Sequence, residues 1–258
     1  NRSGVTSTAF TGLQAGVYSI SETVPAGWSL DLAACDNGDA PDAIRLAPGE
    51  TVKCTFENTK RGSLTIGTWL FGPADASFLF TSNTLPTGAF SLTTAGGFAL
   101  RTFSNIAPGN YDVAQTLLAG YELFGAVCST DDTPNHVTVG AGEDVICGFF
   151  NVQQSSLTVV KNAVGGDGLF TFGGTLGAFN LTTSGGTAQQ RFDNLLTGSY
   201  VISEAVPAGW HLDSAVCDNG DNPETLTLTP GQHVTCTFAN TRLSSITIVK
   251  ETVNGNDT

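Results

Sequence analysis

The chain repeats its own sequence over most of its length. Residues 1–59 align with residues 183–241 without a gap, and residues 90–151 align with residues 179–240. A long stretch that recurs in this way indicates tandem copies of one supersecondary unit. The repeat predicts domains of about 90 residues each, which is within the usual size range of an independently folding domain.

Short runs of alternating apolar and polar residues fill each copy. SLTVVK (156–161), YVISE (200–204) and HVTCTFANT (233–241) are separated by turns rich in Gly, Pro, Asn and Asp. Strict alternation is the mark of a half-buried strand. About seven such runs in one repeat predict an all-β fold, a small immunoglobulin-like β-sandwich.

The repeat also predicts where one domain gives way to the next. Residues 243–258 match the opening strand of a repeat, and residues 1–60 match only the later part of one. An apolar strand with no neighbours is normally disordered. We therefore expect strand 245–258 to add to the incomplete first domain of a neighbouring copy, in a head-to-tail row. A longer array divided at an arbitrary point would have the same ends. The four expected segments are 1–60, 61–153, 154–242 and 243–258.

Charge and composition exclude several classes of function. The formal net charge of −13 argues against nucleic-acid or anionic-membrane binding, because both need a basic surface. The sequence has no apolar run long enough to cross a membrane, no signal peptide and no initiator methionine. We therefore expect a mature or excised segment of an exported protein, without membrane insertion.

Six cysteines fall into three equally spaced pairs, one in each repeat. Metal sites use tighter clusters of ligands, so the spacing favours three disulfides and an oxidising, extracellular or cell-surface location. Three reduced, buried pairs are the alternative. The expected disulfides are Cys35–Cys54, Cys128–Cys147 and Cys217–Cys236.

No cofactor or metal is expected from the remaining polar motifs. DNGD at 36–39 and 218–221 predicts turns, and a calcium loop there would need more ligand positions than the spacing offers. The three histidines lack ligand spacing and any nucleophile motif.

One lysine, one glutamate and one asparagine share the inner faces of three predicted strands in the last complete repeat. Lys161 alternates with Leu157 and Val159, while Glu204 and Asn240 alternate with apolar residues in the same manner. Burying a lone charge is costly, so such groups become neutral or find partners. We expect these three side chains to form one buried unit.

These residues and their motifs resemble a known family. VVK (159–161), SEAVPAGW (203–210) and FANT (238–241) are similar to the signatures of collagen-adhesin B-type, prealbumin-like (SpaA-like) domains of bacterial surface proteins and pili. The resemblance covers essentially the whole chain. It implies a spontaneous isopeptide bond from Lys161 to Asn240, with Glu204 as proton shuttle. A buried Lys–Glu pair without a bond, or a lysine that reaches out to solvent, is the alternative.

The other two repeats differ at these positions. The middle repeat has Thr68 and Gln115 in place of the lysine and glutamate, and keeps only the asparagine, Asn151. A joint loss indicates that the two charged residues act as one unit. The first repeat has Glu22 and Asn58, and we expect Lys250 of a neighbouring copy to meet them and join the chains covalently.

Together these features predict an extracellular structural protein, a repeat-built stalk or head-to-tail filament subunit, and not an enzyme. The alternative is an adhesin module that binds a host or carbohydrate ligand through its loops.

Overall fold

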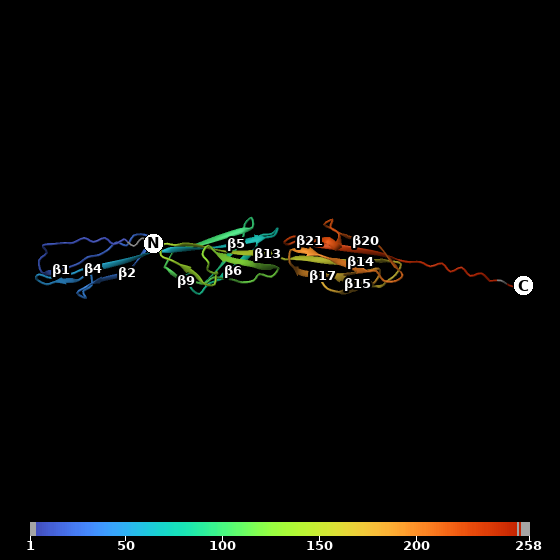
Figure 1. The fold of residues 1–258 in the computed structure, drawn as a ribbon, viewed down its shortest axis with the longest axis horizontal. Coiled ribbons are helices and arrows are strands. Elements are labelled where there is room, and N and C mark those ends of the chain that lie inside the picture. The colour runs from blue at the N-terminus through green and yellow to red at the C-terminus, as the bar shows by residue number, and fades with distance from the viewer. Residues whose placement is uncertain (1–3, 252, 254–258) are drawn as a thin grey trace. The chain divides into compact units, whose positions relative to one another are not determined.

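The computed structural model describes residues 4–251 and residue 253, and strands and turns make up almost all of them (Figure 1). The described residues contain no α-helix, and so no helix long and apolar enough to cross a membrane. The chain divides into two compact units. Residues up to Asn151 form the first, and residues from Val152 onward form the second together with segments 72–74 and 119–122. The all-β expectation is confirmed, while the four exact domain boundaries stay a prediction.

The last complete repeat is a two-layer β-sandwich. One layer has strand order β17-β14-β22-β20, the other β16-β15-β19, and β18 pairs with β21. Its strands and one short 3₁₀ helix are β14 (Ser155–Val164), β15 (Leu169–Gly174), β16 (Phe179–Thr182), β17 (Thr187–Leu195), β18 (Gly198–Tyr200), β19 (Ile202–Ala205), β20 (Trp210–Cys217), η1 (Pro223–Thr225), β21 (Leu226–Leu228) and β22 (His233–Arg242).

The first and last strands of this repeat lie side by side in the centre of one sheet. β14 pairs with β22 in parallel, with Val159 beside Cys236 and Lys161 beside Phe238. The inward residues of both strands, with Phe170 and Phe172 of β15, form the core. A parallel pair of central strands is buried on its inner face, which explains the Val- and Leu-rich alternation of β14.

The middle repeat has the same architecture, with sheets ordered β11-β13-β5-β8 and β10-β6-β7 and a β9–β12 pair. Its strands are β5 (Gly62–Phe71), β6 (Ser77–Thr81), β7 (Ala89–Thr93), β8 (Phe98–Ile106), β9 (Gly109–Tyr111), β10 (Ala114–Gln115), β11 (Tyr121–Cys128), β12 (Val137–Val139) and β13 (Asp144–Gln153).

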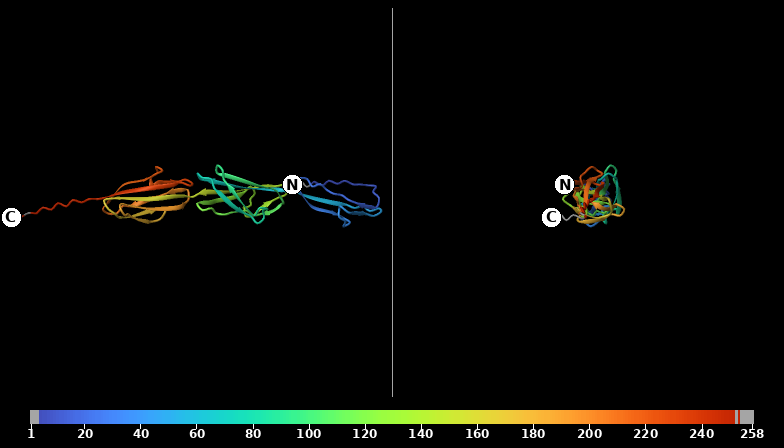
Figure 2. Two further views of the ribbon diagram at one scale, coloured as in Figure 1. Left: turned by 180° about the vertical axis from the view of Figure 1, so that it is seen from behind. Right: turned by 90° about the vertical axis from the view of Figure 1, so that its right-hand side faces the viewer.

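The described residues of the first repeat, drawn in blue in Figure 2, form two strand pairs, β2–β4 and β1–β3. Its strands are β1 (Gly16–Tyr18), β2 (Trp28–Cys35), β3 (Ile44–Leu46) and β4 (Cys54–Lys60). Residues 5–13 and 20–23 match β17 and β19 in sequence but form no strand. In the last repeat β17 pairs with β14 and β19 with β15, and described residues 4–60 contain no counterpart of β14 or β15. Strands without a pairing partner leave their backbone groups to water.

Exposure of the apolar residues reflects this difference. Ile20 is 40% exposed, whereas its counterpart Ile202 is fully buried. The segment after β22 shows a larger difference of the same kind. Ile246 and Ile248 are about 90% exposed, while their counterparts in β14 are fully buried. Residues 252 and 254–258 of the predicted tail strand lie outside the described residues.

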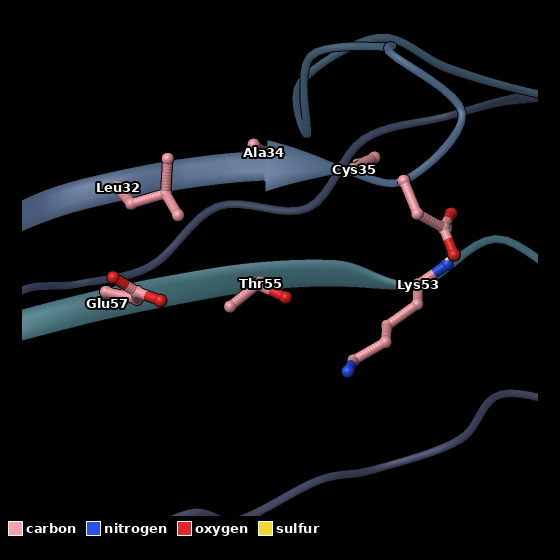
Figure 3. Close-up of a pocket in the computed structure, with 7 residues that line it drawn as sticks. Leu32, Ala34, Cys35, Lys53, Thr55 and Glu57 are labelled. Carbon is pink, nitrogen blue, oxygen red and sulfur yellow. Dashed lines mark hydrogen bonds between the residues drawn. The ribbon is translucent and has the colours of Figure 1, made fainter.

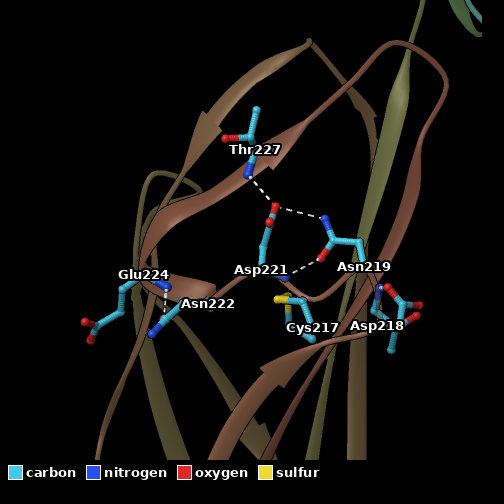
Figure 4. The surroundings of a disulfide bond; sticks show 9 residues. Cys217, Asp218, Asn219, Asp221, Asn222, Glu224 and Thr227 are labelled. Atoms are coloured by element: carbon cyan, nitrogen blue, oxygen red, sulfur yellow. Dashed lines mark hydrogen bonds between the residues drawn. A yellow bond between two sulfur atoms is a disulfide. The ribbon is translucent and has the colours of Figure 1, made fainter.

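The six cysteines form the three expected disulfides, each closing a loop with a sequence separation of 19. In the last repeat the bond joins neighbouring residues of β20 and β22, Cys217 and Cys236. The loop that begins at Cys217 is closed by its own hydrogen bonds (Figure 4): Asp221 Oδ2 accepts from the Thr227 backbone and from Asn219 Nδ2, at 3.1 and 2.9 Å.

A tyrosine anchors the same turn in every repeat. The hydroxyl groups of Tyr18, Tyr111 and Tyr200 each donate to the backbone carbonyl four residues earlier, at 2.7, 2.6 and 2.8 Å. This local bond fixes the bend before the strand that follows, in the manner of the tyrosine corner of β-sandwiches. The G-x-Y pattern of the three repeats carried this signal in the sequence.

Candidate functional site

The three predicted polar residues of the last repeat meet in its core. Lys161 lies on β14, Glu204 on β19 of the opposite layer, and Asn240 on β22. The Lys161 Nζ donates to Asn240 Oδ1, to Glu204 Oε2 at 3.3 Å and to the Phe238 carbonyl at 3.4 Å. Asn240 Nδ2 donates to Glu204 Oε1 at 2.7 Å. Glu204 therefore has one oxygen on the amine and the other on the amide nitrogen.

This cluster is closed to solvent. The side chains of Lys161 and Glu204 are fully buried, and so is Asn240. The ammonium also lies 4.3 Å from the centre of the Phe170 ring. Burial lowers the pKa of Lys161, and the Glu204 charge only partly opposes this effect. A lowered lysine pKa increases the neutral fraction, which is the nucleophilic form.

The middle repeat replaces this unit with an uncharged one. Asn151 Nδ2 donates to Thr68 Oγ1 and to Gln115 Oε1, both at 3.0 Å, and Gln115 Nε2 donates back to Asn151 Oδ1 at 2.6 Å. Thr68 and Asn151 are almost completely buried. The side-chain amides of Gln115 and Asn151 thus satisfy each other's hydrogen-bonding groups without a charged residue. This cluster also has no amine that could act as a nucleophile.

The described part of the first repeat, residues 4–60, contains an acid and an amide at these positions. Asn58 Nδ2 donates to Glu22 Oε1 at 2.6 Å, the same bond that Asn240 makes with Glu204. The remaining oxygens, Glu22 Oε2 and Asn58 Oδ1, are buried and have no hydrogen-bond partner among the described residues. An unsatisfied buried polar atom costs about 1–3 kcal/mol. The corresponding two oxygens of the last repeat both contact Lys161 Nζ.

Lys250 is exposed on the segment that follows β22. Its sequence context, ITIVK, matches LTVVK of β14. The described residues contain no group of three or more His, Cys, Asp or Glu side chains that could hold a metal ion.

A pocket lies on the outward face of β2 and β4 in the first repeat (Figure 3). It is lined by Leu32, Ala34, Cys35, Asp36, Lys53, Thr55 and Glu57. Lys53, Thr55 and Glu57 alternate with the inward residues of β4, so the pocket is on the opposite face from Asn58. It belongs to the outer surface of this ribbon and not to the acid–amide pair.

An aromatic outer face of the middle repeat was not expected from the sequence. Trp69 stacks on Phe150 with ring centres 5.4 Å apart, and the indole lies flat because Gly67 and Gly148 are beneath it. A Cβ atom at these glycines would come within 2.5 and 2.9 Å of the Trp69 ring.

Neighbouring residues extend this face, which we call the Trp69 face. It comprises Trp69, Phe98, Leu100, Ile146 and Phe150, and Phe98, Leu100 and Ile146 are each at least half exposed. The matching positions of the last repeat are Asn162, Thr187, Gln189, Thr235 and Ala239. A difference of this kind between repeats of one fold marks a surface that is not required by the fold itself.

Comparison with known protein families agrees with this architecture. A family model described as a prealbumin-like fold domain, SpaA type, matches residues 1–60 and 157–242. A second prealbumin-like model of the same type matches residues 76–149. The chain belongs to the SpaA-type prealbumin-like family. This confirms the predicted fold class of the prealbumin-like chain and the resemblance on which the isopeptide expectation rests.

A search of curated proteins found no match to this prealbumin-like chain. Solved structures that resemble it include the Bacillus anthracis TIE protein, at 15% identity and a TM-score of 0.31, with 86% of this chain and 51% of that chain covered. The chain thus spans about half the length of that protein.

Two further solved structures cover the chain less completely. The major pilin protein (T-13) of Streptococcus pyogenes has 13% identity and a TM-score of 0.27, with 71% of this chain and 98% of that chain covered. The C-terminal fragment of the pilus adhesin SpaC of Lactobacillus rhamnosus GG has 15% identity and a TM-score of 0.28, with coverage of 73% and 100%. At this level of identity the likeness concerns the fold alone.

Proposed function

We propose that the chain is an extracellular structural protein, a repeat-built subunit of a stalk or filament, in which an isopeptide bond locks the last repeat. One observation carries the proposal: a buried lysine amine contacts a buried asparagine amide, and one glutamate contacts both. The three disulfides support the extracellular assignment.

The reaction follows from these contacts. Glu204 takes a proton from the Lys161 ammonium, and the neutral amine attacks the Asn240 side-chain carbon. Glu204 then gives the proton to Asn240 Nδ2, the Cγ–Nδ2 bond breaks, and ammonia leaves. Glu204 takes the second proton of the attacking nitrogen, which becomes a neutral amide, and the Glu204 carboxyl group ends protonated. The fold supplies the proximity that makes this slow amide exchange intramolecular. The product removes a buried charge and ties β14 to β22.

Such a tie suits a structural role. The bonded atoms are separated by 79 residues of sequence, and a cross-link that closes a loop of this size contributes roughly 4–5 kcal/mol on the loop-entropy model. Because β14 and β22 are the first and last strands of the repeat, tension along the chain enters and leaves through the bonded pair.

The mass of the reduced, denatured chain tests the bond. We expect a mass lower by one ammonia, and a proteolytic peptide in which Lys161 and Asn240 are joined. The Lys161→Arg variant keeps the charge and cannot form the bond, so it should have the full mass. Lys53→Arg is the matched control at an exposed position immediately before β4. A full-mass wild-type chain with no joined peptide would remove the bond from the proposal.

We propose in addition that copies associate head to tail, by addition of segment 245–251 to the free edge of β4. β4 pairs only with β2 among the described strands, whereas its counterpart β22 also pairs with β14. The exposed Ile246 and Ile248 would fill the places of Leu157 and Val159. The size distribution in solution tests this: Ile248→Asp should give monomers where the wild type gives longer species. Equal distributions would contradict the association.

A second candidate function is adhesion to a carbohydrate, and the Trp69 face favours it. Flat aromatic rings stack on the apolar faces of sugar rings, and the Trp69 face combines the half-buried, stacked rings of Trp69 and Phe150 with side chains that carry no charge. A panel of immobilised oligosaccharides tests the idea. Binding that Trp69→Ala abolishes, and that the control Leu79→Ala on the other sheet preserves, would favour adhesion. Absence of binding by the wild type would favour the purely structural reading.

A further inference from the structure

The outward face of β5 and β13 in the middle repeat is shaped around one tryptophan. Gly67 and Gly148 lie there at the positions of Val160 and Thr237 in the last repeat. A Cβ atom at these glycines would come within 2.5 and 2.9 Å of the Trp69 ring, so a larger residue at either position would push the indole away. The two glycines therefore leave the space in which the indole lies flat on the sheet.

Phe150 continues this flat surface. A Cβ atom at Gly148 would lie 3.4 Å from the Phe150 ring as well as 2.9 Å from the Trp69 ring, so both rings rest over the same glycine. Their planes differ by 23°, and their centres are 5.4 Å apart. The two rings together form one aromatic platform on the outside of the sheet.

A pair of hydroxyl groups lies next to this platform. β5 and β8 are antiparallel, and their register sets Gly67 opposite Leu100 and Thr65 opposite Thr102. The two threonine hydroxyls are 2.9 Å apart and exposed to solvent. Alternate residues of a strand are about 7 Å apart, so the hydroxyl pair begins one row beyond the glycines under the indole. The face thus offers flat apolar rings and free hydroxyl groups side by side.

The charges of this sheet exclude an anionic ligand. The charged residues of β5, β8, β11 and β13 are Arg101, Glu122 and Asp144. The Arg101 guanidinium packs 4.9 Å from the centre of the Phe103 ring, which belongs to the core. No base of these four strands, all of which the structure describes, therefore lies on the outward face. An anion on this face would meet acids alone.

The same sheet of the last repeat keeps the charges that the middle repeat lacks. Arg191 pairs there with Asp193 at 2.6 Å, and Asp213 lies on the edge strand β20. The middle repeat has Thr102 in place of Arg191, and Phe124, which is 80% exposed, in place of Asp213. The common fold requires none of these exchanges, and an uncharged exposed surface of this kind marks a recognition site.

Flatness and neutrality together select the ligand. Aromatic residues that dominate protein–protein interfaces insert into pockets of the partner, whereas the Trp69 ring is half-buried and lies over glycines. A ring in this position suits a ligand that has a flat apolar face of its own. Hexopyranose rings with equatorial substituents have such faces, and their hydroxyls lie at the rim. The hydroxyls of Thr65 and Thr102 can donate to and accept from that rim.

We infer that the Trp69 face binds neutral hexopyranose chains with equatorial links, of the cello- or chito-oligosaccharide type. One sugar ring lies on Trp69 and Phe150, and the next lies over Thr65 and Thr102. The inference rests on the adhesion candidate proposed above and names the chemical class of its ligand.

Calorimetric titration of the full chain with cellohexaose and chitohexaose tests the ligand class. Maltohexaose, with axial links, and a hyaluronan hexasaccharide, with equatorial links and carboxylates, are the comparison ligands. We expect one of the first two to bind at least about tenfold more tightly than either comparison ligand. In the series that binds, affinity should rise about tenfold from the monosaccharide to the disaccharide, and Thr65→Val with Thr102→Val should remove that rise.

A glycine variant tests the platform itself. Gly148→Thr introduces the residue of the last repeat and displaces the indole, so it should weaken binding about tenfold although every aromatic residue is retained. Gly109→Thr is the matched control, because a Cβ atom there meets nothing within 4 Å. Trp69→Ala should abolish binding. This variant adds no group to the sheet, so it keeps the test decisive if Gly148→Thr does not fold.

The outcomes separate this inference from the adhesion candidate. Equal binding of maltohexaose or of the hyaluronan fragment, or a folded Gly148→Thr variant that binds as the wild type does, would overturn the inference and leave adhesion standing. Absence of binding to every sugar tested would overturn both. Wild-type dimers that bind no sugar, and that Trp69→Ala dissociates, would show that a second copy covers the face instead.

Discussion

At the scale of single residues, the two complete repeats differ by exchanges that remove charge from the core. Gln115 takes the place of Glu204, and Thr68 takes the place of Lys161. In the middle and last repeats the asparagine amide lies at the centre of the cluster. Its nitrogen donates to Thr68 and Gln115 in the middle repeat and to Glu204 in the last. Of the two complete repeats, the one with a buried lysine has the acid, and the one without a lysine has the neutral amide in its place.

A graft into the middle repeat tests this coupling. Thr68→Lys alone should destabilise the middle repeat by about 3–5 kcal/mol, because it buries an ammonium without a counter-charge. Adding Gln115→Glu should recover most of that loss and allow a bond to Asn151. Denaturant unfolding and the mass of the chain measure the two effects. Equal stability of the single and double variants would contradict the coupling.

The Lys161 amine also predicts a pH dependence. Burial lowers its pKa from the ordinary value of 10.5, so the unfolded state holds the proton more strongly than the folded state. In an Asn240→Ala variant, which cannot form the bond, stability should therefore rise with pH between the lowered pKa and 10.5, by at most about 1.4 kcal/mol per pH unit. Chemical denaturation across this range measures it. The linked wild type should lack the rise, since an amide nitrogen does not titrate there.

Residues of this kind could be predicted from the sequence only where alternation fixes their direction. Lys161, Glu204 and Asn240 each alternate with core residues, so their meeting in the core followed. The Asp167 carboxylate was not predicted, although it accepts from the backbone of Gly185 and Gly186 at 3.2 and 2.8 Å, and these bonds lower its pKa. Such a contact joins two turns that are close only after folding.

At the scale of elements, strands depend on the partners that the sheet gives them. Residues 5–13 have the alternation of β17, yet form no strand in the first repeat, because β17 is held by β14. Sequence pattern therefore predicted the strands of the last complete repeat, whereas the same alternation in residues 5–13 is not sufficient to form a strand. Periodicity reports which face of a strand is apolar, and pairing decides whether the strand forms.

The disulfides also hold paired strands together, and Cys128–Cys147 joins β11 to β13. Replacing Cys128 and Cys147 by Ala should lower the stability of the middle repeat by about 2–4 kcal/mol, because the unfolded chain loses its closed loop. Calorimetry of the full chain measures the shift of the corresponding transition. The same change at Cys217 and Cys236 is the control, and it should leave the last repeat the more stable of the two if the Lys161 bond has formed.

At the scale of the whole molecule, the two complete repeats should respond differently to tension. A formed Lys161–Asn240 bond holds the 79 residues between its ends out of the force path. In the middle repeat only hydrogen bonds join Thr68 to Asn151. We expect this repeat to extend by roughly 200 Å, at up to about 3.5 Å per residue and with the disulfide loop still closed. Single-molecule stretching measures the length.

Two controls bear on this prediction. Reduction of Cys128–Cys147 should release its 19-residue loop and add roughly 60–70 Å to the extension of the middle repeat. Lys161→Arg should make the last repeat extend as well, by a similar length. A wild-type chain in which both repeats extend equally would show that the last repeat is not locked.

The uncharged cluster of Thr68, Gln115 and Asn151 then has a consequence for how the middle repeat would recover after repeated stretching. Hydrogen bonds that break can form again when the load falls, whereas a broken covalent bond cannot. A repeat held in this way converts a sudden pull into heat and recovers its length afterwards. The middle repeat would therefore dissipate the energy of a sudden pull reversibly, in series with a last repeat that the proposed Lys161–Asn240 bond keeps from extending.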